Sequence, residues 1–510
     1  MNVTVKQGFI QEADADAVAV NLFKGVTRPG GATGAVDRAL GGAITELIGV
    51  GDFKGKLGET AVLYSRGAMP APRVIIIGLG ESGDFDLEGV RKASAAAARR
   101  AKALGVERLA TIVHGAGIGG LEPRDAAQAT VEGTLLATYE FRELKTERDE
   151  EDSRELTDLT VMEVSADKVK TIRQGAQIGQ IVSNGVKLAR DLGNRPGNLA
   201  TPTHLAETAE RIADETGMRC EIFDEEQMRK LGLGALLGVA RGSEEPARFI
   251  VLEHNAGRDD LDTIVLVGKG LTFDTGGISL KRSQGMEAMK FDMMGGAAVL
   301  GAMQAVGELG LPQHVVGLVP ATENMPGGSA DKPGDVLTAL NGKTVEVINT
   351  DAEGRLILAD GLSYAQRFEP DAVIDLATLT GACAMALGPY ATGLFTNDEA
   401  LAARVKAAAE ATGERVWPLP LYDEHKKEVK SDFADVKNTG KGRYGGASIG
   451  AAFLSHFVGD YPWVHLDIAP TAWTDEARDY TTKGATGIGV RLLVRFLQEW
   501  SSPARMTGQG

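Results

Sequence analysis

The first part of the chain alternates short apolar, β-branched runs with longer alanine-rich segments. The alanine-rich segments Val90–Leu104 and Ala126–Leu144 are long enough to be helices. The short runs predict strands at Ala61–Ser65, Val74–Ile77, Arg108–Val113 and Leu159–Val164. Strands that alternate with helices indicate a mostly parallel sheet with helices packed on it.

A helical segment near Ala166–Leu192 precedes a second series of strands, which are more apolar than the first. Runs of this kind are typical of a sheet covered on both faces. They lie at Thr263–Val267, His314–Val319, Thr344–Ile348, Ala372–Leu376 and Trp463–Ile468. Because 510 residues exceed what one compact core usually holds, we expect two α/β domains, residues 1–165 and 166–510. Each is predicted to be a mostly parallel or mixed sheet with helices on both faces.

Charge and cysteine usage limit the partners and the compartment. The formal net charge of -16 should on average repel nucleic acid and anionic membranes. Two cysteines, Cys220 and Cys383, are too few for a disulfide framework, which fits a reducing cytoplasm. The N-terminus MNVTVKQGFI has no signal-peptide pattern. The longest uncharged stretch, Leu376–Asn397, contains three glycines and a proline, so no membrane span is predicted.

A glycine motif in the first part resembles a dinucleotide fingerprint. Gly78, Gly80 and Gly83 follow the strand Val74–Ile77 with G-x-G-x-x-G spacing. The fingerprint also needs an acidic residue at the end of the next strand, where this chain has Val113-His114-Gly115. Dinucleotide binding is therefore not predicted. An alternative that stays open is a small-ligand module built around the loop Gly78–Gly83.

Acidic residues gather in two glycine-rich segments at the ends of predicted strands. One is VGKGLTFDTGGISLK, followed shortly by KFDMMGG, and the other is NTDAEGRL. The carboxyl ends of parallel strands form the functional edge of an α/β sheet, so several carboxylates should converge there. The acids are Asp274, Asp292, Asp351 and Glu353.

Uncompensated acids beside buried strands are costly, and two divalent cations would neutralise them. Oxygen ligands suit Mn²⁺ or Mg²⁺, and Zn²⁺ also accepts them. The seven histidines are scattered without an H-E-x-x-H pair, and His465 in an apolar strand is interpreted as a core residue. For each acid taken alone, the alternative is that it caps a turn or pairs with Lys269, Lys281 or Arg355.

These segments resemble those of the leucyl aminopeptidase family of two-metal metallopeptidases, also called the cytosol aminopeptidase family. NTDAEGRL, residues 349–356, matches the family's signature octapeptide at every position. VGKGLTFDTGGISLK is similar to its other metal-binding loop, and RDLGNRPGNLATP resembles the opening of its catalytic domain. The resemblance spans Arg190–Trp473, whereas the N-terminal part is similar only in architecture and length.

The resemblance implies a set of metal ligands and an activity. Lys269, Asp274, Asp292 and Glu353 would hold one metal. Asp274, Asp351 and Glu353 would hold the other. The implied activity is removal of the N-terminal residue of peptides, preferably one like leucine, by a water that both metals activate. A lysine ligand must be neutral, which nearby dications and burial would favour.

The resemblance also implies the catalytic groups, the substrate pocket and the assembly. Lys281 would stabilise the oxyanion, and Arg355 would hold bicarbonate as the general base. Met289, Thr378 and Gly381 would form the side-chain pocket, with a contribution from Gly445–Leu454. Members of the family are hexamers, so a homo-hexamer is expected. A two-metal phosphatase or nuclease, and a DNA-binding architectural role, are the alternatives.

Overall fold

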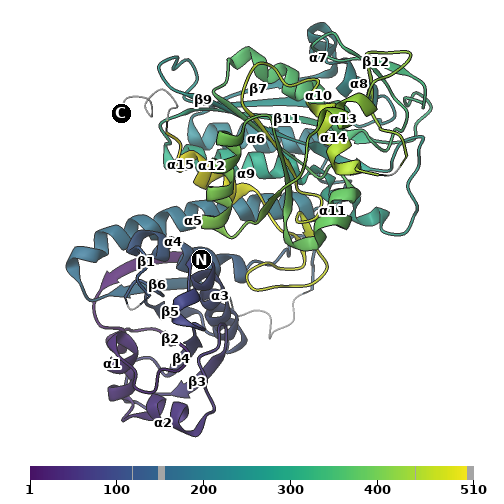
Figure 1. The fold of residues 1–510 in the computed structure, drawn as a ribbon. Coiled ribbons are helices and arrows are strands. Elements are labelled where there is room, and N and C mark those ends of the chain that lie inside the picture. Colours follow the sequence, from purple (N-terminus) through teal and green to yellow (C-terminus); the bar gives the residue numbers. More distant parts are fainter. Residues whose placement is uncertain (118, 148–154, 443, 502–510) are drawn as a thin grey trace. The chain divides into compact units, whose positions relative to one another are not determined.

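The computed structural model describes residues 1–117, 119–147, 155–442 and 444–501, which form two compact units. Unit 1 comprises Met1–Ser183 and Glu476–Thr482. Unit 2 comprises Asn184–Asp475 and Lys483–Gly510. Helix α5 (Ala166–Asn194) belongs to unit 1 over its first part and to unit 2 over its last part (Figure 1). The predicted domain boundary, at the start of this helix, stays a prediction.

Unit 1 is built on a six-stranded sheet with the order β1-β6-β5-β2-β4-β3. All neighbouring strands are parallel except β3, which runs antiparallel to β4 at one edge. The four strands predicted in this region are confirmed as β3 to β6. The strands are β1 (Asn2–Gln7), β2 (Ala17–Leu22), β3 (Thr60–Tyr64), β4 (Arg73–Gly78), β5 (Arg108–Thr111) and β6 (Asp158–Glu163).

Helices cover both faces of this sheet, because alternate side chains of each strand point to opposite sides. On β2, Ala17 and Ala19 pack in a core with α3 (Leu87–Ala103), α4 (Pro123–Ala137) and α5. Val18 and Val20 pack in a second core with α1 (Gly31–Ala39) and α2 (Ala43–Val50). The doubly covered sheet expected from the sequence is confirmed, although α4 ends earlier than predicted.

The G-x-G-x-x-G motif serves packing. A Cβ on Gly78 would lie 2.0 Å from the carbonyl oxygen of Lys56, so only glycine lets these two backbone segments approach. No α-helix starts directly after the motif, since α3 begins at Leu87 with Asp86 as its N-cap. A phosphate site of the dinucleotide-binding kind is therefore not formed at this loop.

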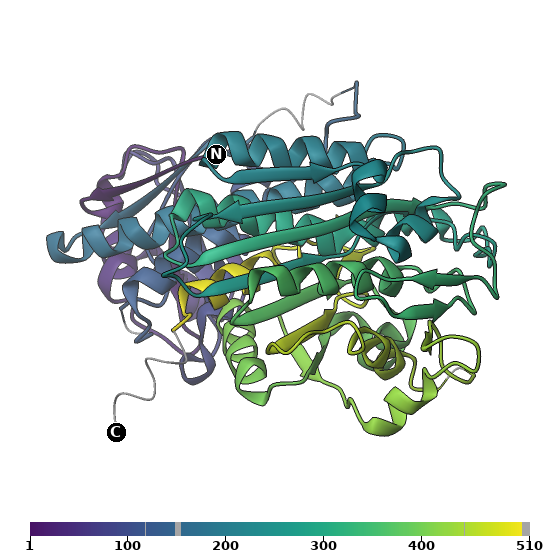
Figure 2. The same cartoon turned by 90° about the horizontal axis from the view of Figure 1, so that it is seen from above.

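Unit 2 is built on a mixed sheet whose long strands run side by side in Figure 2. The sheet has nine strands in the order β16-β15-β18-β14-β9-β11-β8-β7, and β10 pairs with β11. Its central strands β18, β14, β9 and β11 are parallel, and β10 is parallel to β11. The strands are β7 (Arg219–Phe223), β8 (Arg248–His254), β9 (Thr263–Gly268), β10 (Gly270–Asp274), β11 (His314–Asn324), β14 (Ala372–Ala377), β15 (Thr392–Thr396), β16 (Val416–Pro418) and β18 (Trp463–Asp467).

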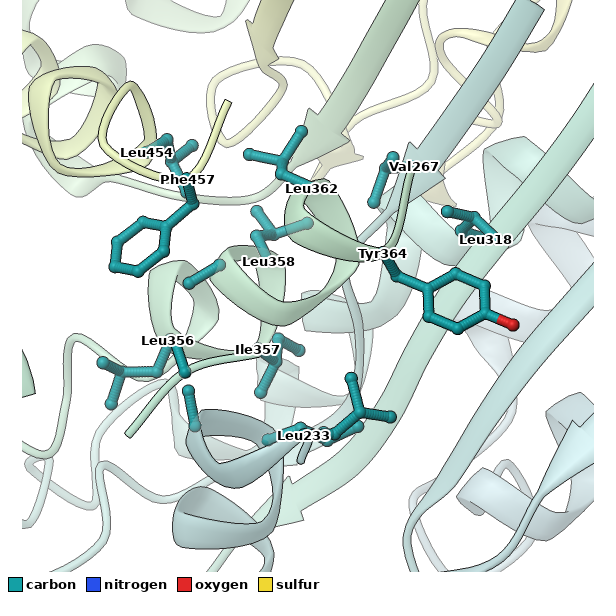
Figure 3. Packing of buried hydrophobic residues seen from close by; sticks show 14 of the residues in the cluster. Leu233, Val267, Leu318, Leu356, Ile357, Leu358, Leu362, Tyr364, Leu454 and Phe457 are labelled. Carbon is teal, nitrogen blue, oxygen red and sulfur yellow. The ribbon is translucent and has the colours of Figure 1, made fainter. Parts of the chain in front are cut away.

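Helix α10 (Gly354–Ala365) covers one face of this sheet, and all of its residues are buried. Its Leu358 and Leu362 belong to the same core as Val267 and Leu318 of the strands (Figure 3). Helix α9 (Met294–Leu309) packs on the opposite face against β9, β11 and β14. The remaining helices are α6 (Pro202–Thr216), α7 (Glu225–Leu231), α8 (Gly234–Ala240), α11 (Gly381–Leu387), α12 (Glu399–Thr412), α13 (Asp423–Glu428), α14 (Gly446–Leu454) and α15 (Val490–Gln498).

The prediction that Thr344–Ile348 is a strand of the main sheet is wrong. This segment forms β13 (Thr344–Glu346) in a separate three-stranded sheet with β12 (Val336–Thr338) and β17 (Val436–Lys437). The physical reason is local pairing, because β12 and β13 are joined by a short turn and form an antiparallel ladder. Within the described ranges, no helix is both long and apolar enough to cross a membrane.

Candidate active site

The carboxyl ends of four parallel strands bring polar side chains to one edge of the unit 2 sheet. Lys269 follows β9, and Asp274 ends β10. Asn324 ends β11, and Thr378 follows β14. The site therefore lies at the functional edge that the strand pattern predicted.

Lys269 is buried among the predicted ligands. Its Nζ atom lies 2.7 Å from Asp292 Oδ2 and 2.9 Å from Glu353 Oε1. It also donates to the carbonyl oxygen of Thr378 at 3.1 Å. A Cβ on Gly354 would lie only 2.6 Å from this Nζ, so the glycine of NTDAEGRL makes room for the lysine.

Lys281 joins the other two acids and is the more accessible of the two lysines. Its Nζ atom lies 2.7 Å from Asp274 Oδ2 and 2.5 Å from Asp351 Oδ1. The side chain of Lys281 is 24% exposed, compared with 3% for Lys269. Lys281 is thus the lysine that an incoming substrate could reach.

The NTDAEGRL loop is held at the sheet edge by hydrogen bonds that do not involve the acids themselves. Thr350 Oγ1 donates to the carbonyl oxygen of Gly276 at 2.6 Å and accepts from the backbone N–H of Ser279 at 2.8 Å. Asn438 Nδ2 donates to the carbonyl oxygen of Asn349 at 2.7 Å. These bonds explain how Asp351 and Glu353 reach the edge although β13 is outside the main sheet.

Burial and mutual repulsion make the acids reluctant to ionise together. Burial, followed by the charge of Asp274, raises the pKa of Glu353 to about 8. Burial also raises the pKa of Asp292 and the pKa of Asp351 above their usual values, although lysines oppose the shifts. Four acids with two lysines leave an excess of negative charge in a largely buried place.

The lysines act as counter-charges in this arrangement. Burial disfavours the charge on Lys269, but Asp292 and Glu353 outweigh it and raise its pKa above the usual value. The pKa of Lys281 is also raised, because Asp274, Glu353 and Asp351 outweigh the effect of burial. Lys269 would be neutral only if bound cations outweighed the negative charge of the carboxylates around it. Its role as a metal ligand therefore stays a prediction.

The donor set fits divalent cations. Oxygen atoms of Asp274, Asp351 and Glu353 lie within 4.8 Å of one another. Glu353 Oε2 is buried and has no hydrogen-bond partner among the described residues. A buried carboxylate oxygen without a partner is costly, and a cation shared with neighbouring oxygens would satisfy it.

Arg355 lies in the first turn of α10 and is buried. One guanidinium N–H donates to the carbonyl oxygen of Asn438 at 2.7 Å, whereas Nε has no hydrogen-bond partner in the described part of the chain. Burial lowers the pKa of Arg355, and the charges of Glu353 and Asp467 oppose the shift. A buried guanidinium with free N–H capacity beside a helix N-terminus is suited to hold a small anion.

The three predicted pocket residues lie on segments around this edge. Thr378 is buried, and its Oγ1 donates to the carbonyl oxygen of Asp292 at 2.9 Å. Met289 is half-buried on the 3₁₀ helix Met286–Met293, which also carries Asp292. Gly381 is exposed at the start of α11. Thr378 therefore lies beside the predicted ligand Asp292, and the role of the three residues as a side-chain pocket stays a prediction.

Helix α14, which carries most of the predicted pocket segment Gly445–Leu454, lies against the same region. A Cβ on Gly450 would lie 3.3 Å from Thr380 Cγ2 and 3.6 Å from an Arg355 guanidinium nitrogen.

His465 is fully buried on β18, with Nδ1 2.6 Å from Asp375 Oδ1, so its interpretation as a core residue is confirmed.

Comparison with known proteins identifies the family. A family model described as "Cytosol aminopeptidase family, catalytic domain" matches residues 187–494, and the corresponding N-terminal domain matches residues 19–148. A Roseiflexus castenholzii protein named "Probable cytosol aminopeptidase" is 48% identical over 502 residues, which cover 98% of this chain and all of that protein. The chain belongs to the cytosol aminopeptidase family.

Solved structures of the family agree with this assignment. A tomato leucine aminopeptidase mutant superposes with a TM-score of 0.85 at 36% identity, covering 98% of this chain and 96% of that one. The bottromycin maturation enzyme BotP in complex with Mn superposes with a TM-score of 0.83 at 35% identity, covering 95% and 99%. The protein is a metal-dependent aminopeptidase, and the phosphatase, nuclease and DNA-binding alternatives are not favoured.

Sequence reasoning missed the groups that support the acids. Asn324 and Asn438 lie outside the two motifs, and each bonds to a motif residue. The predicted strand ended at Val319, whereas β11 continues to Asn324, so the predicted strand end did not point to this asparagine.

Proposed function

We propose that the protein removes N-terminal residues, preferably leucine-like ones, from peptides with the help of two divalent cations. The observation that carries the proposal is the cluster of Asp274, Asp351 and Glu353, in which Asp274 and Glu353 are buried and Glu353 Oε2 lacks a partner among the described residues. One cation would be held by Lys269, Asp274, Asp292 and Glu353. The other would be held by Asp274, Asp351 and Glu353, so that Asp274 and Glu353 bridge the two.

The cations and the side chains have separate tasks. When bound, the two cations would lower the pKa of the attacking water and hold the free α-amine of the substrate. Lys281, the accessible lysine of the cluster, would donate to the scissile carbonyl oxygen and stabilise the negative charge that develops there. Arg355 would hold bicarbonate, which takes the proton of the water and so replaces a histidine base.

The substrate side chain would lie against Met289, Thr378 and Gly381. Methionine adapts its shape to different apolar groups, which fits a broad preference for leucine-like residues. The half-buried position of Met289 supports this role, because a core methionine would be fully enclosed.

The cations we propose are Mn²⁺ or Zn²⁺, with Mg²⁺ as the alternative. Carboxylate ligation suits all three, and the related enzyme BotP is described in complex with Mn. We also propose that the chain forms a homo-hexamer in the cytoplasm, as the family resemblance implies. Light scattering on the purified protein will measure the mass of the assembly.

Metal analysis of single variants tests the site. Glu353→Ala removes the carboxylate proposed to bridge both cations, so the metal content and the aminopeptidase rate should fall together. Glu287→Ala is the matched control, because Glu287 is an exposed acid on the 3₁₀ helix that carries Asp292. Full metal content and a normal rate in Glu353→Ala would show that the site lies elsewhere.

A further inference from the structure

Unit 1 contains a cavity of about 660 Å³ that the aminopeptidase reaction does not use. Pockets of this volume hold cofactors and other small molecules. The cavity lies at the carboxyl ends of five parallel strands. The last residues of these strands, or the residues directly after them, line it; the strands are β1, β2, β4, β5 and β6. Examples are Phe9, Leu22, Leu79, Val113 and Met162.

The topology of unit 1 creates an opening at this edge. Strand β2 lies between β5 and β4 in the sheet. The connection that leaves β2 passes through α1 and α2 on one face, whereas α3 and α4, which follow β4 and β5, lie on the other face. Connections that depart to opposite faces leave a crevice at the carboxyl ends of the strands, and ligands of open α/β sheets bind in that crevice.

The cavity offers groups that recognise an anion. The N-cap of α1 is Gly30, which provides no side-chain cap, and Gly30 and Gly31 both line the cavity. Thr33 Oγ1 donates to the carbonyl oxygen of Asn21 at 2.7 Å and so fixes the first turn of α1 at the end of β2. Free backbone N–H groups at a helix start attract phosphate.

Basic side chains surround the cavity in a protein of net charge -16. Arg28, Arg38 and Lys168 line it, and none of them forms an ion pair within the described residues. A Cβ on Gly34 would lie 3.6 Å from an Arg38 guanidinium nitrogen, so this side chain folds back toward the start of α1. Among the described residues of the lining, Glu163 is the one acidic side chain.

The rest of the lining suits a ring system. Phe9, Phe23, Val26 and Ile112 contribute apolar surface. Gln11 also lines the cavity, and its Oε1 is buried without a hydrogen-bond partner among the described residues. An amide oxygen of this kind can accept from an exocyclic amine of a base.

We propose that this cavity binds a nucleotide, with its phosphates at the first turn of α1 and its base between the apolar walls. The site differs from the glycine motif at Gly78–Gly83, of which only Leu79 reaches the lining. It lies wholly within unit 1, so its test is independent of the aminopeptidase proposal.

Calorimetry on the full-length protein tests the proposal with ADP, adenosine and inorganic pyrophosphate as probes. ADP should bind saturably at one site per chain, and the other two probes should bind more weakly because each satisfies only part of the cavity. Gly117 is an exposed residue of the lining, and its added Cβ would meet no atom within 4 Å, so Gly117→Trp places a large ring at the lining without a backbone clash and should abolish ADP binding. Gly83→Trp is the matched control, because Gly83 is equally open and lies outside the lining.

Charge variants locate the phosphates. Arg38→Glu should weaken ADP binding about tenfold or more, as loss of a charge-assisted contact does. Arg100→Glu makes the same change of charge at an exposed position on α3, outside the cavity, and should leave the affinity for ADP unchanged. Unaltered aminopeptidase activity of Gly117→Trp will show that this variant is folded.

Two results would overturn the proposal. One is the absence of saturable ADP binding at millimolar concentration. The other is ADP binding that survives Gly117→Trp but is lost in Glu353→Ala, because the nucleotide would then be bound by the carboxylate site of unit 2.

Discussion

Asn324 donates a hydrogen bond to Asp274, with 2.9 Å between Nδ2 and Oδ1. The same amide nitrogen lies 3.0 Å from the carbonyl oxygen of Thr350, to which it also donates. One side chain at the end of β11 therefore fixes the orientation of a predicted bridging ligand and the position of the NTDAEGRL loop. Groups that orient metal ligands influence affinity although they do not touch the metal.

Asn324→Ala should weaken metal binding without removing a ligand. The loss of an orienting group typically lowers metal affinity or activity about 10- to 100-fold. Titration of the metal-depleted protein with Mn²⁺, followed by activity, measures the shift. At saturating Mn²⁺ the variant should recover much of its rate, and a loss of rate that added metal does not reverse would contradict an orienting role.

Lys281→Ala should retain both cations and lose catalytic rate. Removal of Lys281 takes a positive charge away from Asp274 and Asp351, so the carboxylates should bind cations at least as well. The rate should fall roughly 100-fold or more if Lys281 stabilises the oxyanion. Arg282→Ala, a change at the neighbouring exposed residue, provides the control. A near-normal rate in Lys281→Ala with full metal content would exclude the proposed contact with the substrate.

Arg355→Ala should keep both cations and lose its response to bicarbonate. Its expected loss of rate is milder, because water can partly replace a general base that contributes about 10²- to 10⁴-fold. Arg355→Lys keeps a positive charge but lacks the planar fork of donors, so it should recover only part of the response. The measurement is the rate in carbonate-depleted buffer with and without added bicarbonate. If the Arg355→Ala rate rose with bicarbonate as the parent rate does, the anion site would be misassigned.

The stability of unit 1 should decrease at acidic pH because of His114. This histidine is 1% exposed, and burial lowers its pKa from 6.5 to about 4. The folded state favours the neutral form of His114. The contribution of His114 to the free energy of unfolding is therefore complete above pH 6.5 and is lost as the pH falls toward 4. At about 1.4 kcal/mol per pKa unit, the loss is of the order of 3 kcal/mol.

His114→Gln should remove this part of the pH dependence. Hydrogen exchange of the β2 and β5 amides, followed by mass spectrometry, reports on unit 1 alone. Protection in the parent should decline more steeply between pH 6.5 and 4 than in the variant. Equal declines would mean that His114 is not the group that titrates.

The sequence predicted the main strands and the two acidic segments because these features are local. Buried parallel strands are recognisable as apolar β-branched runs, and the end of the predicted strand Thr263–Val267 indicated where Lys269 lies. Strand β10, which ends at Asp274, was not predicted. The resemblance of VGKGLTFDTGGISLK, KFDMMGG and NTDAEGRL to family segments supplied the predicted ligand set.

Features that depend on pairing across the chain were not predictable. Strand β13 (Thr344–Glu346) pairs locally with β12, but its other partner is β17, about ninety residues away along the chain, and no local pattern encodes that pairing. The contact of Arg355 with Asn438 joins segments 83 residues apart, and no local pattern encodes it. The cavity of unit 1 also has no sequence signature, because its lining comes from five strand ends and the start of α1.

The most direct test of the account compares leucine p-nitroanilide with its N-acetylated form before chelation, after chelation, and after addition of Mn²⁺, Zn²⁺ or Mg²⁺. The free-amine substrate should be hydrolysed by the native protein, inert after chelation and hydrolysed again with at least one added cation. The acetylated substrate should be inert throughout, because it lacks the free α-amine. Two results would contradict a metal-dependent aminopeptidase. One is hydrolysis of the free-amine substrate by protein from which metal analysis shows that all cations have been removed. The other is comparable rates on both substrates.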